Sequence, residues 1–309
     1  MPDHVVTAPA WWVVLAAALL GAVSLVAAAL DGALADRESP SRGAAMPVLE
    51  VARLLRQRRR RTVAADLLLW RVGISGLVPV ALLMVTLVPL GRWTLFDSPV
   101  GVVWFNALDV LVWALVWLAG WGPNAVFGLV GGYRFLALAL GYELPLMFAL
   151  VAPAVAAGSL RVGDLAAGQA GLWYVVWMPV AFVVYCLGVV AFSVWGPFAV
   201  AAGDDLAGGV LAEVSGVDRL LFLAGRYALL AAGSAFAVPL FLGGGAGPVL
   251  PSWAWVLIKT VVLVALLVAA GRRLPALRPD KFVEVAWVVL LPAVLLQDLG
   301  VAVVAVGRS

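Results

Sequence analysis

The sequence predicts an all-α membrane protein with eight transmembrane helices and one further amphipathic helix on the cytoplasmic side. Of its 309 residues, 65% are hydrophobic and only 12% are charged, whereas soluble domains carry roughly 45–50% apolar and about 25% charged residues. The mean hydropathy is +1.09. A soluble fold of this size could not bury so much apolar surface. These observations exclude a soluble enzyme, a nucleic-acid-binding protein and a disordered chain.

Eight apolar runs are long enough to cross a bilayer, because a helix needs about 20 apolar residues to do so. They cover residues 9–30, 66–90, 99–120, 124–155, 171–196, 218–243, 252–271 and 283–306. We expect them to form one integral-membrane domain over residues 1–309. The fourth run contains Pro145, which predicts a tilted or kinked helix. The first lacks a small-residue cleavage site after a short core, so we expect a retained helix.

The connections between the runs differ in their content of arginine and lysine. The connections 31–65 and 272–282 hold eight and four of these residues, against three on the opposite side, which are Arg92, Arg161 and Arg308. The positive-inside rule therefore predicts a cytoplasmic location for both basic connections. Both termini would then lie on the outer side of the cell's inner membrane. The net charge of +3 requires no nucleic acid to explain it.

Residues 46–57 (MPVLEVARLLRQ) predict an amphipathic helix at the cytoplasmic interface. Apolar side chains alternate there with Glu50 and Arg53, Pro47 fits a helix start, and the segment is too short to span. The four arginines 58–61 follow directly. They either lie among anionic lipid headgroups or act only as a topology signal.

Ionisable residues within predicted spans are costly and often functional. They are Arg71, Asp109, Arg134, Glu143, Arg226, Lys259 and Asp298. Glu143 lies in the middle of the fourth span, in the string GYELP. It is either a proton-accepting carboxylate in a polar pathway or a buried carboxylate tied to Lys259 or Arg226 that holds helices together. Arg134, nine residues away, is too far along the helix to be its direct partner.

The connection 197–217 holds further acids, Asp204, Asp205 and Glu213. They either extend a chain of protonatable sites from Glu143 or belong to a solvated loop that is acidic by chance.

The sequence offers no candidate catalytic residue and no candidate metal ligands. Cys186 is the only cysteine and His4 the only histidine, which excludes an iron–sulfur cluster, a structural zinc site and an internal disulfide. There is no glycine-rich nucleotide loop after a strand-like run. We therefore expect no cofactor to be bound by this chain alone.

Several short strings together resemble one family, the membrane H subunit of respiratory NADH:quinone oxidoreductase (complex I) and its counterparts in group 4 [NiFe] hydrogenases, such as formate hydrogenlyase subunit 4. The strings follow the family order from about residue 44 to 295. They are Pro47, Glu50 and Arg53 with Leu54-Leu55; LAGWGPN at 118–124; the interval from Arg134 to Glu143; PF at 197–198 with the acids after it; AEVSG at 212–216; Lys259; and Pro275, Arg278, Asp280 and Pro292.

The resemblance implies a non-catalytic membrane anchor that docks a peripheral electron-transfer module and couples its chemistry to ion movement. Glu143, Glu213, Asp204 and Asp205 would form the ion pathway, with Arg134 as a charge partner. Pro47, Glu50 and Arg53 would help to build a cavity, and Arg278 with Asp280 would lie at the docking face. Implied partners are iron–sulfur and [NiFe]-type or quinone-reductase-type peripheral subunits, antiporter-like membrane subunits and the lipid bilayer. A quinone could bind at the interface with those subunits.

The sequence also departs from the family pattern. Gly141 replaces a serine, Leu138 a glutamine, Ala199 an acid, Val214 a tyrosine, and Arg226 a glutamate usual in complex I. GVLAEVSG at 209–216 is nearer to the hydrogenase version of its loop. We therefore favour a hydrogenase-type subunit at this stage. The alternative is a true H subunit of NADH-quinone oxidoreductase that contributes to a quinone site. A stand-alone secondary transporter is a remote third interpretation, since no internal repeat is visible.

Overall fold

The computed structural model describes residues 5–307 and is helical apart from one pair of two-residue strands. The α-helices are α1 (Val13–Ala35), α2 (Pro40–Arg56), α3 (Leu67–Ser75), α4 (Leu77–Thr86), α5 (Gly101–Trp121), α6 (Val126–Ala157), α7 (Val162–Ala167), α8 (Tyr174–Trp177), α9 (Pro179–Phe192), α10 (Gly216–Phe241), α11 (Ser252–Arg273), α12 (Pro279–Val285) and α13 (Leu291–Val306). The strands β1 (Val6–Thr7) and β2 (Trp93–Thr94) pair in parallel. The remaining elements are the 3₁₀ helices η1 (Ala10–Trp12), η2 (Gly196–Ala202), η3 (Asp204–Leu206) and η4 (Gly209–Leu211), and one π-helical turn, η5 (Ala286–Leu290).

Eight helical segments within the described residues are long and apolar enough to cross a membrane, which confirms the predicted fold class and number of spans. They are Ala10–Ala35, Leu67–Thr86, Gly101–Trp121, Val126–Ala157, Pro179–Ala202, Gly216–Phe241, Ser252–Arg273 and Pro279–Val306. The protein is therefore a multi-pass membrane protein. His4 and Arg308 lie outside the described residues.

Several boundaries differ from the prediction by a few residues, and two of the differences have a visible cause. The fifth span begins at Pro179 rather than at residue 171, because Pro179 suits a first helical turn. The Gln297 side chain accepts hydrogen bonds from the next two backbone N–H groups, those of Val180 at 2.9 Å and Ala181 at 3.3 Å. The amphipathic helix begins at Pro40, so the predicted start at Pro47 is wrong. Pro47 lies inside α2, where it removes only the hydrogen bond to the Gly43 carbonyl.

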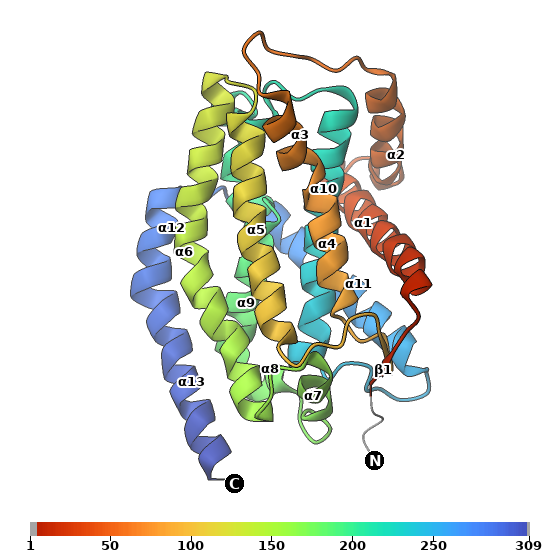
Figure 1. The fold of residues 1–309 in the computed structure, drawn as a ribbon, viewed down its shortest axis with the longest axis vertical. Coiled ribbons are helices and arrows are strands. Elements are labelled where there is room, and N and C mark those ends of the chain that lie inside the picture. Colours follow the sequence, from red (N-terminus) through yellow and green to blue (C-terminus); the bar gives the residue numbers. More distant parts are fainter. Residues whose placement is uncertain (1–4, 308–309) are drawn as a thin grey trace.

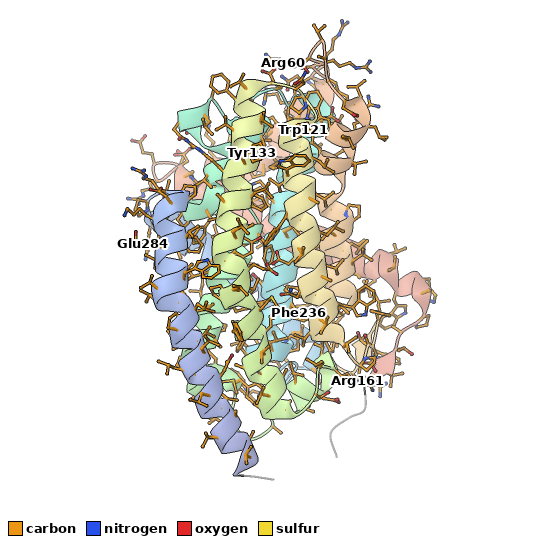
Figure 2. All side chains as sticks on the ribbon, turned by 60° about the vertical axis from the view of Figure 1, so that its left-hand side comes forward. Arg60, Trp121, Tyr133, Arg161, Phe236 and Glu284 are labelled. Atoms are coloured by element: carbon orange, nitrogen blue, oxygen red, sulfur yellow. The ribbon has the colours of Figure 1, made fainter. Side chains whose placement is uncertain are left out.

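The helices pack around two long central members, α6 and α10 (Figure 1). Helix α6 contacts α5, α9 and the α12–α13 segment, whereas α10 contacts α1, α4 and α11. In the core, Phe105 of α5 stacks on Phe236 of α10 with ring centroids 3.9 Å apart; Figure 2 shows Phe236 enclosed by the helices. Helix α1 crosses the bundle obliquely, and α13 lies at its edge (Figure 1).

The elements separate into two ends. Helix α2 and the connection that follows it lie at the upper end of Figure 1, whereas β1 and the last turn of α13 lie at the lower end. Helix α6 runs past Pro145 and Pro153 without interruption. Its 32 residues make about 48 Å of helix, more than the hydrocarbon core of about 30 Å. Part of α6 therefore stands outside the bilayer.

Candidate functional site: a cavity, a carboxyl pair and a charged cleft

A cavity of about 570 Å³ lies between α1, α2, α4 and α10, and we call it the α1–α2 cavity. Its walls are mostly apolar, with Leu25 of α1 and Met46 of α2 both about half-exposed at its surface. The predicted residues Pro47 and Glu50 line it. Arg53 lies beside it and donates hydrogen bonds of 2.5 and 2.6 Å to Glu50, which lower the pKa of the Glu50 carboxyl. This size and lining suit an elongated apolar ligand with a polar head.

The polar end of the α1–α2 cavity is formed by Asp31 and Tyr227. Asp31 is buried and accepts hydrogen bonds from the Tyr227 hydroxyl at 3.0 Å and from Arg272 Nε. The Tyr227 ring lies 5.2 Å from that of Trp195. Asp31 was not among the predicted site residues. It stands in the last turns of α1, where the helix dipole disfavours a carboxylate, and this unfavourable position was the signal in the sequence.

The second feature is a pair of carboxyl groups in the middle of the bundle, Asp109 of α5 and Glu143 of α6. Asp109 is fully buried and Glu143 is 8% exposed. Asn106 Nδ2 donates to Glu143 Oε1 at 3.0 Å, whereas Glu143 Oε2 and both carboxyl oxygens of Asp109 have no hydrogen-bond partner among the described residues. A buried ionised carboxylate without a partner is costly, and a protonated carboxyl is a hydrogen-bond donor as well as an acceptor. The pair is therefore a candidate proton-holding site.

Glu143 has neither of the cationic partners considered for it. Lys259 instead donates to the carbonyls of Leu242, Gly244 and Ala246 at 2.7–2.9 Å and lies 4.1 Å from the centroid of the Trp173 ring. The Cζ atom of Arg226 lies 5.5 Å from the centroid of the Trp195 ring. The idea that one of these cations ties Glu143 in place is wrong. Asp109, one of the ionisable residues within the predicted spans, is the group that lies beside it.

The third feature is a cleft of about 950 Å³ between α6, η2–η3 and the start of α12, called the charged cleft below. It brings together five predicted residues, Arg134, Asp204, Asp205, Arg278 and Asp280. Arg134 pairs with Asp205 at 2.5 Å and Arg278 with Asp280 at 3.0 Å. The expectation that Arg134 does not pair with Glu143 is thus confirmed. Phe198 of the predicted string PF packs on Phe282 of α12, with ring centroids 4.7 Å apart, and so joins η2 to α12 beside the cleft.

Glu213 lies apart from these features. It is half-buried in the turn before α10 and lines neither large cavity. Within residues 5–307 we find no hydrogen bond or ion pair to its carboxyl. The structure therefore groups nine of the ten predicted site residues in or beside three features and leaves Glu213 outside them.

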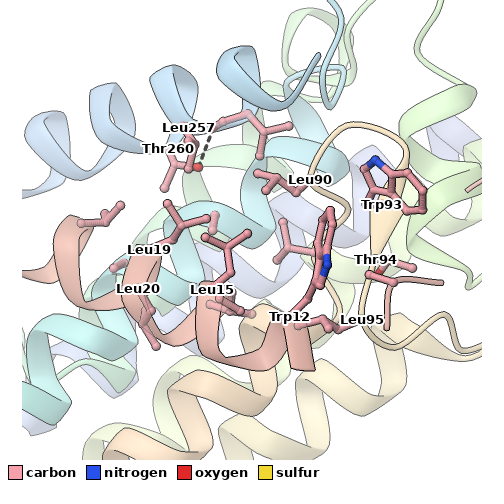
Figure 3. Close-up of a pocket in the computed structure, with 18 residues that line it drawn as sticks. Trp12, Leu15, Leu19, Leu20, Leu90, Trp93, Thr94, Leu95, Leu257 and Thr260 are labelled. Carbon is pink, nitrogen blue, oxygen red and sulfur yellow. Dashed lines mark hydrogen bonds between the residues drawn. The ribbon is translucent and has the colours of Figure 1, made fainter. Parts of the chain in front are cut away.

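A smaller pocket of about 80 Å³ lies at the N-terminal end of α1 (Figure 3). It is lined by residues such as Trp12, Leu15, Leu257 and Thr260, and the Thr260 hydroxyl is bonded to the Val256 carbonyl at 2.7 Å. No ionisable side chain lines it, so it offers no group for proton chemistry. No cluster of three or more potential metal ligands occurs among the described residues.

The fold and these features define a class: a polytopic membrane protein with a largely apolar surface cavity, a buried pair of carboxyl groups and a charged cleft. Comparison with known proteins narrows the class. The family model described as NADH dehydrogenase matches residues 7–302. The chain is 34% identical over 310 residues to the NADH-quinone oxidoreductase H subunit 2 of Cereibacter sphaeroides, covering 96% of both chains. It is 31% identical over 279 residues to the corresponding H subunit 2 of Geobacter sulfurreducens, covering 85% of both.

The H subunit 2 of Rhodopseudomonas palustris is also 31% identical over 298 residues, with 94% of this chain and 93% of that protein covered. The chain belongs to the family of H subunits of NADH-quinone oxidoreductase, and the predicted family is confirmed. None of these three relatives is named as a hydrogenase component. The preference for the hydrogenase branch therefore finds no support, and the alternative of a true complex I member is favoured.

Proposed function

We propose that this chain works as the H subunit of an NADH-quinone oxidoreductase, as a non-catalytic membrane component. In this role it anchors the peripheral electron-transfer subunits, takes a quinone from the bilayer into the α1–α2 cavity and passes protons through buried carboxyls. The α1–α2 cavity is the observation that carries this proposal. It joins a bilayer-facing apolar wall to a buried polar end formed by Asp31 and Tyr227.

The residues of the cavity fit a quinone. Side chains such as Leu20, Leu54 and Leu82 would contact the isoprenoid tail. The Tyr227 hydroxyl would donate to a quinone carbonyl after turning away from Asp31, to which it donates in this structure. The quinone itself supplies the chemistry of accepting two electrons and two protons, with the electrons coming from partner subunits. The ion pair of Asp31 with Arg272 would keep the polar end oriented.

Labelling of engineered cysteines tests the cavity. In a variant whose Cys186 is replaced by alanine, Met46→Cys places a thiol in the cavity wall, whereas Val48→Cys places one on the same helix outside the cavity. A quinone analogue added to the assembled complex should slow maleimide labelling of Met46→Cys by about tenfold, equivalent to roughly 1.4 kcal/mol of protection. It should leave Val48→Cys unchanged. Equal labelling of both thiols with and without the analogue would refute quinone binding here.

The carboxyl pair supports the relay in this proposal. It lies on α5 and α6, deeper in the bundle than the charged cleft, which holds Arg134 nine residues earlier on α6. Asp204, Asp205 and Arg134 are open to water at that cleft, so protons reach the bundle from this end. Antiporter-like membrane subunits would receive the charge beyond Glu143. In this proposal Glu213 acts at a contact with another subunit, since it faces none of the three features.

A further inference from the structure

The small pocket at the N-terminal end of α1, called the N-terminal pocket below, opens toward the bilayer (Figure 3). Its walls come from α1, α4, α10, α11 and the connection that follows α4. On α1 the lining runs from Trp12 to Val23, about 16 Å of helix, which is close to half of the hydrocarbon core of about 30 Å. Leu15 lines the pocket and is 43% exposed. The pocket is therefore open at its side and extends over one leaflet.

The lining of the N-terminal pocket suits a hydrocarbon chain. Its two hydroxyl groups are already bonded within the protein, Thr94 Oγ1 to the Thr86 carbonyl at 3.3 Å and Thr260 Oγ1 to the Val256 carbonyl at 2.7 Å. A quinone ring would therefore find no free hydroxyl in this pocket. The other lining side chains are aliphatic or indole, and such walls bind apolar groups. The bilayer supplies acyl chains on the side where Leu15 is exposed.

A positive charge lies beside the mouth of the N-terminal pocket. Arg92 is exposed, and its Cζ atom lies 4.9 Å from the centroid of the Trp93 ring, which lines the pocket. The Arg92 carbonyl accepts a hydrogen bond from Val6 N at 2.8 Å, so the backbone at this position is fixed by β1. Arg92 has no ion pair among the described residues, whereas Arg161 on the next connection at this end pairs with Asp97 at 3.4 Å. The guanidinium of Arg92 is thus available to an anion.

Tryptophans place Arg92 at the level of the lipid headgroups. Trp11 and Trp253 are exposed and stand at the starts of two spans, and the Trp12 ring lies 5.5 Å from the Trp93 ring. Tryptophan side chains are enriched at the membrane–water interface. A phospholipid carries its phosphate at this level and its acyl chains below it. The charge of Arg92 and the apolar pocket therefore have the order along the membrane normal that a phospholipid requires.

We propose that the N-terminal pocket is a phospholipid site, in which one acyl chain enters the pocket and the phosphate of the same molecule binds Arg92. A guanidinium can donate two parallel hydrogen bonds to phosphate oxygens, and the chain removes the apolar walls from contact with other solvent. The phosphate requirement selects a phospholipid over a neutral lipid or a quinone. Leu20 lines both this pocket and the α1–α2 cavity, so the bound chain also supports the helix that forms a wall of that cavity.

Lipid retention tests the phosphate contact. The tagged chain is purified from its own membrane in mild detergent, together with the subunits that accompany it, and washed. Mass spectrometry of the intact assembly then measures the phospholipid that remains bound. Arg92→Ala should retain about tenfold less of the tightly held phospholipid, because the charged hydrogen bonds to phosphate are lost. Arg92→Lys keeps the charge and should retain more than Arg92→Ala. The matched control Arg161→Ala should retain it like the unaltered chain, since Arg161 is paired with Asp97.

Filling the pocket tests the chain contact. Ala16→Leu fills the N-terminal pocket from α1 and should lose the same phospholipid, and Ala235→Leu fills it from α10 as a second variant. Ala18→Leu is the matched control, because Ala18 is exposed on the same helix and lines neither this pocket nor the α1–α2 cavity. The double variant Ala16→Leu/Arg92→Ala should lose no more lipid than either single variant, because one molecule occupies both parts of the site.

Four results would overturn the proposal, and they are distinguishable. Unchanged retention in both Arg92→Ala and Ala16→Leu refutes a phospholipid at this site. Loss in Ala16→Leu alone identifies an apolar chain that is not held by Arg92, as in a neutral lipid or a quinone. Loss in Arg92→Ala alone identifies a headgroup contact on the surface with no chain in the pocket. Additive losses in the double variant mean that two different lipids are bound.

Discussion

Asp109 and Glu143 illustrate how a residue's chemistry depends on its neighbour. Glu143 alone would be an expensive carboxylate in the membrane, and its one hydrogen-bond donor in the described structure is Asn106. Asp109 is fully buried and forms no ion pair among the described residues. A proton on one carboxyl would turn it from an acceptor into a donor toward the other. In the proposed function the pair holds this proton for relay.

Replacing either carboxyl by its amide should remove this relay. Glu143→Gln and Asp109→Asn keep the size and the hydrogen-bonding capacity of the side chains but cannot ionise. We expect each to lower coupled NADH:quinone turnover and proton pumping by a factor on the order of 10². The double variant should be little worse than either single one, because the two groups act as a unit.

Asp298 provides the control for these variants. It is another acid within a membrane span, on α13, and makes no hydrogen bond among the described residues. Asp298→Asn should leave turnover within about twofold, as expected for a substitution outside the site. Normal pumping by Glu143→Gln, or a loss as large in Asp298→Asn as in Glu143→Gln, would contradict a specific role for the pair.

At the scale of elements, periodicity and length predict the spans well, whereas partners decide where helices begin. The eight spans follow from runs of apolar residues and agree with the structure. The start of α9 depends on the Gln297 side chain, which is 117 residues away from Val180. The start of α2 at Pro40 depends on its packing against α1. Such long-range contacts leave no local pattern in the sequence.

The candidate site shows the same division. Acids and arginines in unusual places were predictable one by one, and family resemblance ordered them along the chain. Their grouping was not predictable from the sequence. Arg134 bonds to Asp205, 71 residues further along the chain, and Arg272 bonds to Asp31, 241 residues earlier. Asp109 was recognised only as one ionisable residue within a span, since Glu143 lies on the following helix. Tertiary contacts therefore decided which candidates act together.

The crossing of α1 and α2 forms one wall of the α1–α2 cavity and depends on two glycines. Gly32 of α1 and Gly43 of α2 pack backbone to backbone, and a Cβ on either would overlap the other's carbonyl. Gly43→Ala should therefore separate the helices and destabilise the protein by about 1–3 kcal/mol. Thermal inactivation of the purified complex and the labelling rate of Met46→Cys both report this change.

Gly300→Ala is the matched control, because nothing lies within 4 Å of a Cβ at this position in α13. Alanine is the better helix former there, so this variant should be neutral or more stable by up to about 1 kcal/mol. Similar behaviour of the two variants would mean that the α1–α2 contact does not limit the stability of the cavity.

For the whole molecule, the proposed function requires one orientation in the membrane. Helix α2 and the connection 57–66 lie at one end of the molecule, whereas β1 lies near the opposite end (Figure 1). In the proposed function the peripheral subunits are in the cytoplasm, so the end with the connection 57–66 would face it. The positive-inside rule predicts the same orientation independently, since twelve arginines and lysines lie in the connections 31–65 and 272–282.

An even number of spans then places both ends of the chain on the outer side. In the Cys186→Ala background, Thr7→Cys on β1 and Gly307→Cys after α13 should react with a membrane-impermeant maleimide in cells whose inner membrane is intact. Glu38→Cys, in the exposed turn between α1 and α2, should react only after the membrane is permeabilised. The opposite pattern would put the basic connection 57–66 outside the cell, against the positive-inside rule. Labelling at Thr7 but not at Gly307 would require an odd number of spans, and α13, the least buried of the eight, would then be the helix that does not cross.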